Sequence, residues 1–165
     1  MNGVDMIGLE LRTFLSGLAG GFRSEQERRN ETTLRELYAR FNRGDVASMA
    51  YLLTEEYESV DVATGERSVG RAAYVTRQEN NRKAMPDAQT EITALLACGE
   101  VAVAEVVNRG TQTGPLVLPT GELPPTGRSV EGRSCEVYTF RNGLIASGRI
   151  YYDLLTVINQ LGLSL

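Results

Sequence analysis

The chain contains no histidine, and Lys83 is the only lysine among its 17 basic residues. The absence of histidine excludes Ser-His-Asp and Cys-His catalysis, and it excludes zinc or iron sites that need histidine ligands. Proton transfer near neutral pH must therefore use Asp, Glu, Tyr, Cys or the single Lys. This restriction does not show that the protein is an enzyme, but it narrows the kinds of enzyme that it could be.

Cysteine, apolar runs and positive charge are also scarce. The two cysteines, Cys98 and Cys135, have no metal-ligand spacing, so we expect two free thiols in a cytoplasmic protein and no metal. No run of 18 apolar residues exists, and the N-terminus carries Asp5 and Glu10 where a signal peptide would be basic. With a net charge of −4, the chain has no basic field for nucleic acid or an anionic membrane.

The chain divides into a short extension and one domain. Residues 1–22 place apolar side chains at helical spacing before Gly20-Gly21, which predicts an amphipathic helix on a hinge. We expect this helix to pack on its own domain or on a partner subunit, and a lid over a pocket is the alternative. Residues 23–165 have the length and the apolar share, 42% over the whole chain, of a single globular domain.

Helices dominate the first half of that domain. Ser24 and Glu27 form a capping-box pattern ahead of a helix that stops at Gly44, with Leu34, Leu37, Tyr38 and Phe41 on one face. Asp45 is expected to cap a shorter helix. A strand is predicted over 57–62 and a third helix over 71–84, which ends before Pro86.

Strands dominate the second half. They are expected at 90–97, 101–109, 130–140 and 144–153, and Asn142-Gly143 predicts a tight hairpin between the last two. The Gly- and Pro-rich stretch 110–128 is a long loop or an interrupted strand, and 154–161 can add a final helical turn or two. The predicted class is therefore α+β. A strongly curved, mostly antiparallel sheet wrapped around the long helix would form a cone-shaped barrel. A cone with one open end is a natural small-molecule pocket.

The last strand carries the first group of candidate catalytic residues. Strand alternation puts Arg149, Tyr151 and Asp153 on one face together with Ile145 and Ser147, and either face of this strand could point inward. If their face lines the cone, burial would raise the pKa of Asp153 and make it a suitable general base. Tyr151 and Arg149 could then stabilise an oxyanion. Alternatively, Asp153 caps the short helix that begins at Leu154.

Further residues could face the same cavity. Asp61 ends its strand and shares a face with Tyr57 and Ser59, although an aspartate before Thr64-Gly65 is also typical of a turn. Tyr38 lies on the apolar stripe of the long helix, where it could fill the core or direct its hydroxyl into the cone.

Three stretches resemble a known family when they are taken in order. They are FNRGDVASMAYLLTEEY (41–57), GEVAVAEVVNRGTQTG (99–114) and RNGLIASGRIYYDLLTVINQLGL (141–163). Their order and spacing are similar to those of the SnoaL-like polyketide cyclases, within the superfamily of ketosteroid isomerase and nuclear transport factor two. The resemblance covers roughly residues 30–163.

The resemblance implies a fold, a chemistry and a set of residues. It implies a cone-shaped α+β barrel that forms a homodimer through its sheet, with cofactor-free acid/base chemistry on a hydrophobic, polyketide-like small molecule. The catalytic aspartate of the cyclases corresponds to Asp153, and the base of the ketosteroid isomerases falls on or near Asp61. Relatives commonly have histidine at Gln112, and a glutamine can donate a hydrogen bond but cannot shuttle a proton.

The leading hypothesis is thus an enolate-forming cyclase or isomerase. Asp153 would remove the proton, Arg149 and Tyr151 would stabilise the enolate, and the substrate would contact the remaining candidates, which are Tyr38, Tyr57, Gln112 and Ser147. One alternative is epoxide opening by Arg149 and Asp153 with Asp61. The other is a non-catalytic binding or assembly module. In that case we expect a pocket filled by side chains, or an Asp153 carboxylate bonded to the backbone amides of the final turn.

Overall fold

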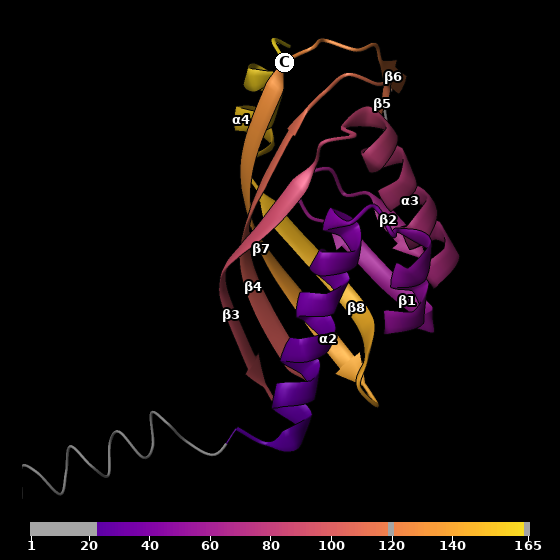
Figure 1. Ribbon diagram of the computed structural model, residues 1–165, viewed down its shortest axis with the longest axis vertical. Helices are drawn as coiled ribbons and strands as arrows, with labels where there is room; N and C mark the ends of the chain where they lie inside the picture. Colours follow the sequence, from indigo (N-terminus) through magenta and orange to yellow (C-terminus); the bar gives the residue numbers. More distant parts are fainter. Residues whose placement is uncertain (1–22, 119–120, 164–165) are drawn as a thin grey trace, which may run out of the picture.

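The computed structural model of the protein describes residues 23–118 and 121–163, and the helix predicted within 1–22 lies outside this range. Helices come first and strands follow, as the sequence predicts (Figure 1). In chain order, the elements are α2 Glu25–Asn42, the 3-10 helix η1 Ala47–Leu52, β1 Leu53–Asp61, β2 Arg67–Val69, α3 Arg71–Ala84, β3 Gln89–Cys98, β4 Val101–Thr111, β5 Leu116–Leu118, β6 Gly121–Leu123, β7 Ser129–Arg141, β8 Leu144–Tyr152 and α4 Leu154–Gln160.

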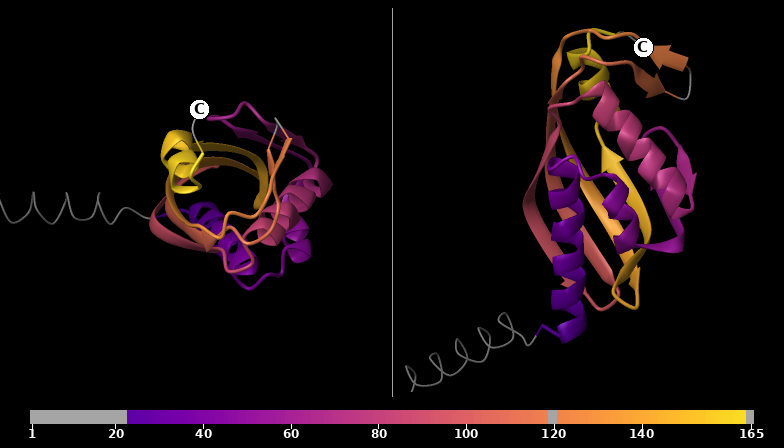
Figure 2. Two further views of the ribbon diagram at one scale, coloured as in Figure 1. Left: turned by 90° about the horizontal axis from the view of Figure 1, so that it is seen from above. Right: turned by 45° about the vertical axis from the view of Figure 1, so that its right-hand side comes forward.

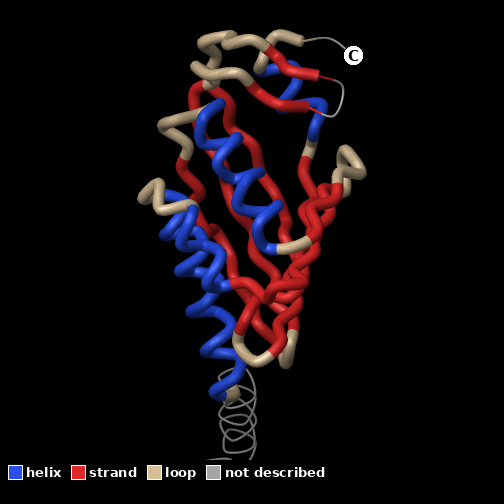
Figure 3. Tube along the Cα trace, turned by 90° about the vertical axis from the view of Figure 1, so that its right-hand side faces the viewer, coloured by secondary structure: helices blue, strands red, loops and turns tan. Residues whose placement is uncertain are grey.

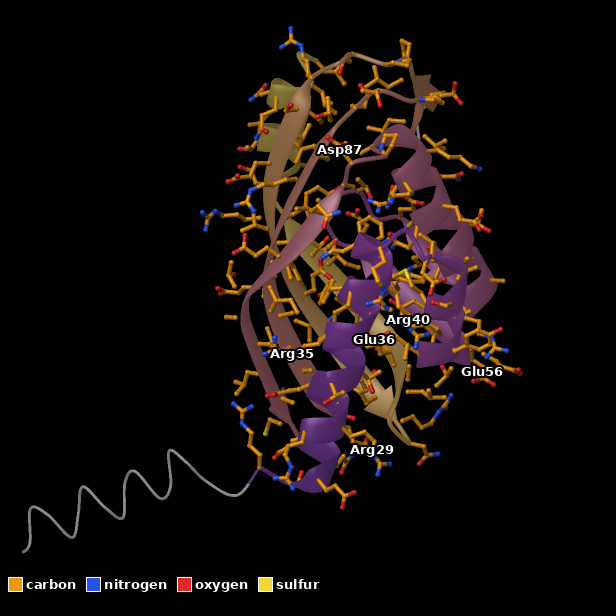
Figure 4. All side chains as sticks on the ribbon, in the orientation of Figure 1. Arg29, Arg35, Glu36, Arg40, Glu56 and Asp87 are labelled. Atoms are coloured by element: carbon orange, nitrogen blue, oxygen red, sulfur yellow. The ribbon has the colours of Figure 1, made fainter. Side chains whose placement is uncertain are left out.

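The first helix begins where its capping box predicts. Ser24 accepts a hydrogen bond from the Glu27 amide at 3.1 Å, and the Glu27 carboxylate accepts one from the Ser24 amide at 2.8 Å. Leu34, Leu37 and Tyr38 are buried, whereas Glu36 and Arg40 form an ion pair one turn apart on the side that is partly open to solvent (Figure 4). The apolar stripe is therefore the face that α2 turns toward the sheet.

The next predicted helix is a 3-10 helix, and Asp45 does not cap it. Val46 occupies the N-cap position of η1 without a side-chain hydrogen bond, and Met49 is its buried residue. The predicted cap at Asp45 is therefore wrong, although Met49 is buried as expected.

Six strands form one sheet in the order β2-β1-β8-β7-β4-β3. Among the strands of the described residues, only the β1–β8 pair is parallel, so the sheet is mostly antiparallel. Figures 2 and 3 show the sheet curling into a cone around α2 and α3. Helix α2 packs chiefly on β3 and α3 packs on β1, so the helices close the cone near the two sheet edges. The cone-shaped α+β barrel predicted from the sequence is confirmed.

Both hairpin turns at the narrow end are tied to α2. Asn142 and Gly143 take positive φ angles of 55° and 80°, as a two-residue hairpin requires. Thr33 donates a hydrogen bond to the Gly143 carbonyl at 3.2 Å, and Asn30 donates one to the Gly99 carbonyl at 3.0 Å. The narrow end of the cone is thus closed by backbone turns bonded to the helix (Figure 3).

A β-bulge in β8 decides which side chains of that strand face the interior. Ile145 is paired with Phe140 and Ser147 with Thr139, so Ala146 is an extra residue between the two pairs. Ile145 is fully buried, but after the bulge the inward set becomes Gly148, Ile150 and Tyr152. The predicted common face of Ile145 with Ser147 and Asp153 is therefore wrong, because simple alternation does not continue through a bulge.

The wide end is built from α4 and from the segment that the sequence predicts as a loop or an interrupted strand. Within that segment, β5 and β6 form a small separate two-stranded sheet (Figure 1). The short strand β2, which the sequence analysis did not predict, pairs with β1 at the sheet edge. No helix within the described residues has the length and apolar character that crossing a membrane requires.

Candidate active site

The wide half of the cone contains a cavity of about 960 Å³. This volume is at the upper end of the range found for small-molecule sites, roughly 300–1,000 Å³. Its walls come from α2, α3, α4 and the inner face of the sheet. Apolar side chains make up much of the lining, among them Phe41, Met49, Val130, Ile150, Leu154, Val157, Ile158 and Leu161.

One carboxylate lies within this lining and is almost completely buried. Glu136 on β7 is only 8% exposed. Its Oε2 accepts hydrogen bonds from the hydroxyls of Tyr38 at 2.9 Å and Tyr138 at 2.5 Å, and its Oε1 accepts one from Ser134 Oγ at 2.9 Å. A buried charge is tolerated when several donors satisfy it, so three hydroxyls explain why this carboxylate can stay in the core.

The network continues from Ser134 across two more strands. The side-chain amide of Asn108 on β4 donates to Ser134 Oγ at 3.2 Å, and the Thr90 hydroxyl on β3 donates to Asn108 Oδ1 at 2.7 Å. Thr90 is in turn fixed by Asn42 at the end of α2, which bonds both its amide and its carbonyl at 2.8 Å. The carboxylate is therefore held by a chain of side chains that runs from helix to sheet.

The two tyrosines that bond Glu136 are held in the neutral, hydrogen-donating form. Burial, reinforced by the negative charge of Glu136, raises the pKa of Tyr38 and of Tyr138 well above the ordinary value of 10.0. Both hydroxyls therefore remain proton donors across the physiological pH range.

A second acidic residue lies at the rim of the cavity. Asp61 Oδ2 accepts a hydrogen bond from the Tyr152 hydroxyl at 3.0 Å, and its Oδ1 accepts from the amides of Ala63 and Thr64, both at 3.1 Å. Burial and the charge of Asp61 raise the pKa of Tyr152. Asp61 thus forms the turn that the sequence suggests and also lines the cavity.

Asp153 lies outside the cavity. It is exposed at the N-cap of α4, where it accepts hydrogen bonds from the Thr156 amide at 3.0 Å and the Thr156 hydroxyl at 2.5 Å. These bonds from Thr156 lower the pKa of Asp153, whereas a general base in a sheltered pocket would have a raised pKa. The prediction that its carboxylate turns into the cone is wrong, and the helix-cap alternative describes its position.

The other candidates from β8 also lie on the outer face of the sheet. Arg149 and Tyr151 are exposed, and Ser147 shares a 2.6 Å hydrogen bond with the hydroxyl of Thr139 on β7. None of the three lines the cavity. The bulge at Ala146 is the physical reason, because it places Gly148, Ile150 and Tyr152 inside instead.

Gln112 is fully buried but holds a loop and does not line the cavity. Its amide nitrogen donates to the carbonyls of Gly114 at 2.8 Å and Pro124 at 3.1 Å. Its amide oxygen accepts from the Thr126 amide at 2.8 Å and the Thr126 hydroxyl at 2.6 Å. All of its hydrogen-bonding positions are filled by the chain itself, so the structure does not place Gln112 as a substrate contact.

Tyr38 lies in the cavity wall, but Tyr57 does not. Tyr57 and Ser59 do share the inward face of β1, as strand alternation predicts, and both are almost fully buried. The Tyr57 ring packs edge-on against Tyr74 with ring centroids 5.1 Å apart, and burial raises its pKa to about 12. Tyr57 therefore belongs to the core beneath the cavity.

Glu136 is the main residue that the sequence analysis missed. It lies in the stretch SCEVYTF, where Ser134, Glu136 and Tyr138 alternate with apolar residues and Phe140 continues the same face. That alternation puts a glutamate on the same strand face as Tyr138 and Phe140. Because glutamate is rarely buried, its position on an aromatic face is the signal that could have identified it. No group of three or more Cys, Asp or Glu side chains that could hold a metal ion occurs within 23–118 and 121–163.

A family model for the SnoaL-like polyketide cyclases matches residues 32–161, which is most of the chain. No curated protein matches the chain at a significant level.

Solved structures show the same fold. A candidate SnoaL-like polyketide cyclase from Jannaschia sp. CCS1 is 19% identical with a TM-score of 0.76, and the match covers 87% of this chain and 98% of that one. A candidate polyketide cyclase from Xanthomonas campestris pv. campestris is 25% identical with a TM-score of 0.68, covering 83% and 99%. A protein with a ketosteroid isomerase-like fold from Catenulispora acidiphila is 20% identical with a TM-score of 0.67, covering 80% and 93%.

Proposed function

The chain belongs to the SnoaL-like polyketide cyclase family, and on this premise we propose that it is an acid/base enzyme that cyclises or isomerises a hydrophobic small molecule through an enolate. The proposal assigns proton transfer to Glu136. The observation that supports it is a nearly buried carboxylate in the wall of a large, mostly apolar cavity.

The hydrogen bonds of Glu136 leave room for one more partner. A carboxylate has about four lone-pair positions. Tyr38 and Tyr138 occupy the two on Oε2, and Ser134 occupies one on Oε1. The remaining position on Oε1 is available to a substrate C–H, while the three hydroxyls keep the carboxylate in place.

The proposed reaction moves one proton and, in a cyclisation, forms one C–C bond. Glu136 removes the proton alpha to a carbonyl, and the electron pair of that C–H bond forms an enolate. In a cyclisation the enolate carbon attacks a second carbonyl of the same molecule, a C–C bond forms, and the resulting alkoxide takes the proton back from Glu136. In an isomerisation the proton returns to a different carbon. General-base action contributes roughly 10²–10⁴-fold, and the cavity supplies the positioning.

The ring opening of nitrobenzisoxazole tests this role without knowledge of the natural substrate. In that reaction a base removes a carbon-bound proton, the N–O bond breaks and a coloured phenolate is released. We expect the wild-type protein to accelerate the reaction and Glu136→Gln to reduce the acceleration by about 10²-fold or more. Glu105→Gln is the matched control, because Glu105 is exposed on the neighbouring strand β4. Equal rates for wild type and Glu136→Gln would contradict the proposal.

A binding module without catalysis is the second candidate. It is favoured by the position of Asp153, whose bond to the Thr156 amide is the arrangement expected for a non-catalytic protein. The large cavity supports ligand binding in either case. Saturable binding of an apolar ligand together with no proton removal by the wild type would favour the binding module. The epoxide-opening alternative is not proposed, because Arg149 and Asp153 lie outside the cavity.

We also propose that two copies of the chain pair through the outer face of the sheet. Leu96 and Val101 are 60% and 40% exposed on this face, and Leu96 lies in one cross-strand row with Val103, Val137 and Arg149. Light scattering should give a dimer for the wild type and a monomer for Leu96→Glu. Val117→Glu, an exposed apolar position on β5, should remain a dimer. A monomeric wild type would contradict this pairing.

A further inference from the structure

The inner face of α3 carries polar side chains where a core-facing helix is usually apolar. Tyr74, Arg77, Gln78 and Asn81 follow one another at helical spacing, and all four line the cavity. Figure 2 shows α3 running along the open side of the cone, opposite the curved sheet. One wall of an otherwise apolar cavity is therefore polar, and it includes a permanently charged group.

Arg77 has no neutralising partner among the described residues. It is half-buried, its Nε is shielded from solvent without a hydrogen-bond partner, and no carboxylate of the described residues lies within 4.0 Å. This is unusual, because charged groups that leave water are normally paired. A structural role for the charge would require a partner that the described chain does not supply.

Three carboxylates of the described residues line the cavity, those of Asp61, Glu66 and Glu136, and none of them lies within 4.0 Å of the Arg77 guanidinium. The oxygens of Asp61 accept hydrogen bonds from Tyr152 and from two backbone amides, and those of Glu136 accept from three hydroxyls. The cavity wall thus contains a cation that none of the described carboxylates pairs with.

We infer that Arg77 binds an acidic group of the ligand, so that the substrate is an anionic hydrophobic molecule and not a neutral one. A guanidinium recognises a carboxylate or an ionised enol through paired hydrogen bonds. Bound in this way, the substrate would be oriented with its acidic end at Arg77 and its apolar rings along the rest of the cavity. The inference rests on the proposed function only in treating this cavity as the ligand site.

A pair of fluorescent probes separates charge from hydrophobicity. Anilinonaphthalene sulfonate and N-phenylnaphthylamine share the same aromatic framework, but only the first carries an anionic group. We expect the wild type to bind the sulfonate probe about tenfold more tightly than the neutral one, as one charge-assisted hydrogen-bonding group implies. Arg77→Gln should remove this preference and leave the affinity for the neutral probe within about twofold.

Arg35→Gln is the matched control for the loss of one positive charge. Arg35 is exposed on α2, is labelled in Figure 4, and does not line the cavity. Both affinities should be unchanged in this variant. If Arg77→Gln fails to fold, Arg77→Met keeps the aliphatic stem that packs in the wall and still removes the charge.

Two results would overturn the inference. The first is a wild type that binds the two probes equally, and the second is a preference for the sulfonate that survives in Arg77→Gln or Arg77→Met. The outcome is separate from the proposed function, which is tested by the proton-transfer rate of Glu136→Gln. An Arg77-dependent preference for the anionic probe would stand even if Glu136→Gln had the wild-type rate. Equally, a slow Glu136→Gln variant would support the proposed function even if Arg77 gave no anionic preference.

Discussion

The hydroxyl of Tyr38 on α2 donates a hydrogen bond of 2.9 Å to Oε2 of Glu136 on β7, although the two residues are 98 positions apart in the chain. This contact joins the long helix to the sheet at the wall of the cavity. It explains why a tyrosine interrupts the apolar stripe of α2, since a leucine at that position would leave the buried carboxylate with one donor fewer.

Replacing Tyr38 with phenylalanine should destabilise the fold. The substitution keeps the ring but removes one of three donors to a buried charge, and a hydrogen bond to a charged group contributes about 1.5–3 kcal/mol. We expect the free energy of unfolding, measured by urea denaturation, to fall by about that amount. Tyr151→Phe is the control, because Tyr151 is exposed on the outer face and should tolerate the change. A Tyr38→Phe variant as stable as the wild type would show that this contact does not hold the carboxylate.

Substitution of Asp153 should affect stability and not turnover. Asp153→Ala removes the N-cap of α4, and a lost cap in a domain of this size lowers Tm by about 2–4 °C. Its bonds to Thr156 lower the pKa of Asp153, so the cap contributes at neutral pH, and its contribution disappears as the pH falls below the ordinary value of 3.8. The difference in Tm between wild type and variant should therefore shrink in acid.

Turnover of nitrobenzisoxazole provides the second measurement on the same variant. We expect Asp153→Ala to open the ring at the wild-type rate, since its carboxylate lies outside the cavity. A large loss of rate with an intact fold would return Asp153 to the list of candidate bases.

Gly148 should not tolerate even one additional methyl group. A Cβ at this position would lie 2.6 Å from the Tyr57 hydroxyl and 3.0 Å from Cε1 of Tyr138. Both tyrosines are buried and cannot easily move aside, so we expect Gly148→Ala to cost about 1–3 kcal/mol of unfolding free energy. Gly132→Ala on β7 is the control, because its Cβ would meet Val157 at an ordinary 3.5 Å. Equal stability of the two variants would contradict the packing described here.

The fold could largely be predicted from local patterns. The capping box at Ser24, the helical spacing of Leu34, Leu37 and Tyr38 and the Asn142-Gly143 turn each act over a few residues, so the sequence shows them directly. The family resemblance then supplied the cone, which local patterns alone leave open.

The site could not be predicted equally well, because it depends on the orientation of side chains. One bulged residue, Ala146, reversed the face of β8 and moved Asp153 and Arg149 out of the cavity. Glu136 was overlooked because a glutamate in a strand is usually exposed, and its hydroxyl partner on α2 becomes its neighbour only when the sheet curls around the helix. Gln112 was expected in the site from the family pattern, but the carbonyls it bonds belong to a loop whose path the sequence does not define.

The central claim is that Glu136 removes a carbon-bound proton from a molecule held in the cavity. The most direct measurement is the exchange of the alpha protons of β-tetralone, a neutral bicyclic ketone, in heavy water, followed by proton NMR. The account predicts accelerated loss of the alpha-proton signals with the wild type and no acceleration beyond buffer with a folded Glu136→Gln variant. Exchange that is equally fast with both proteins would contradict it.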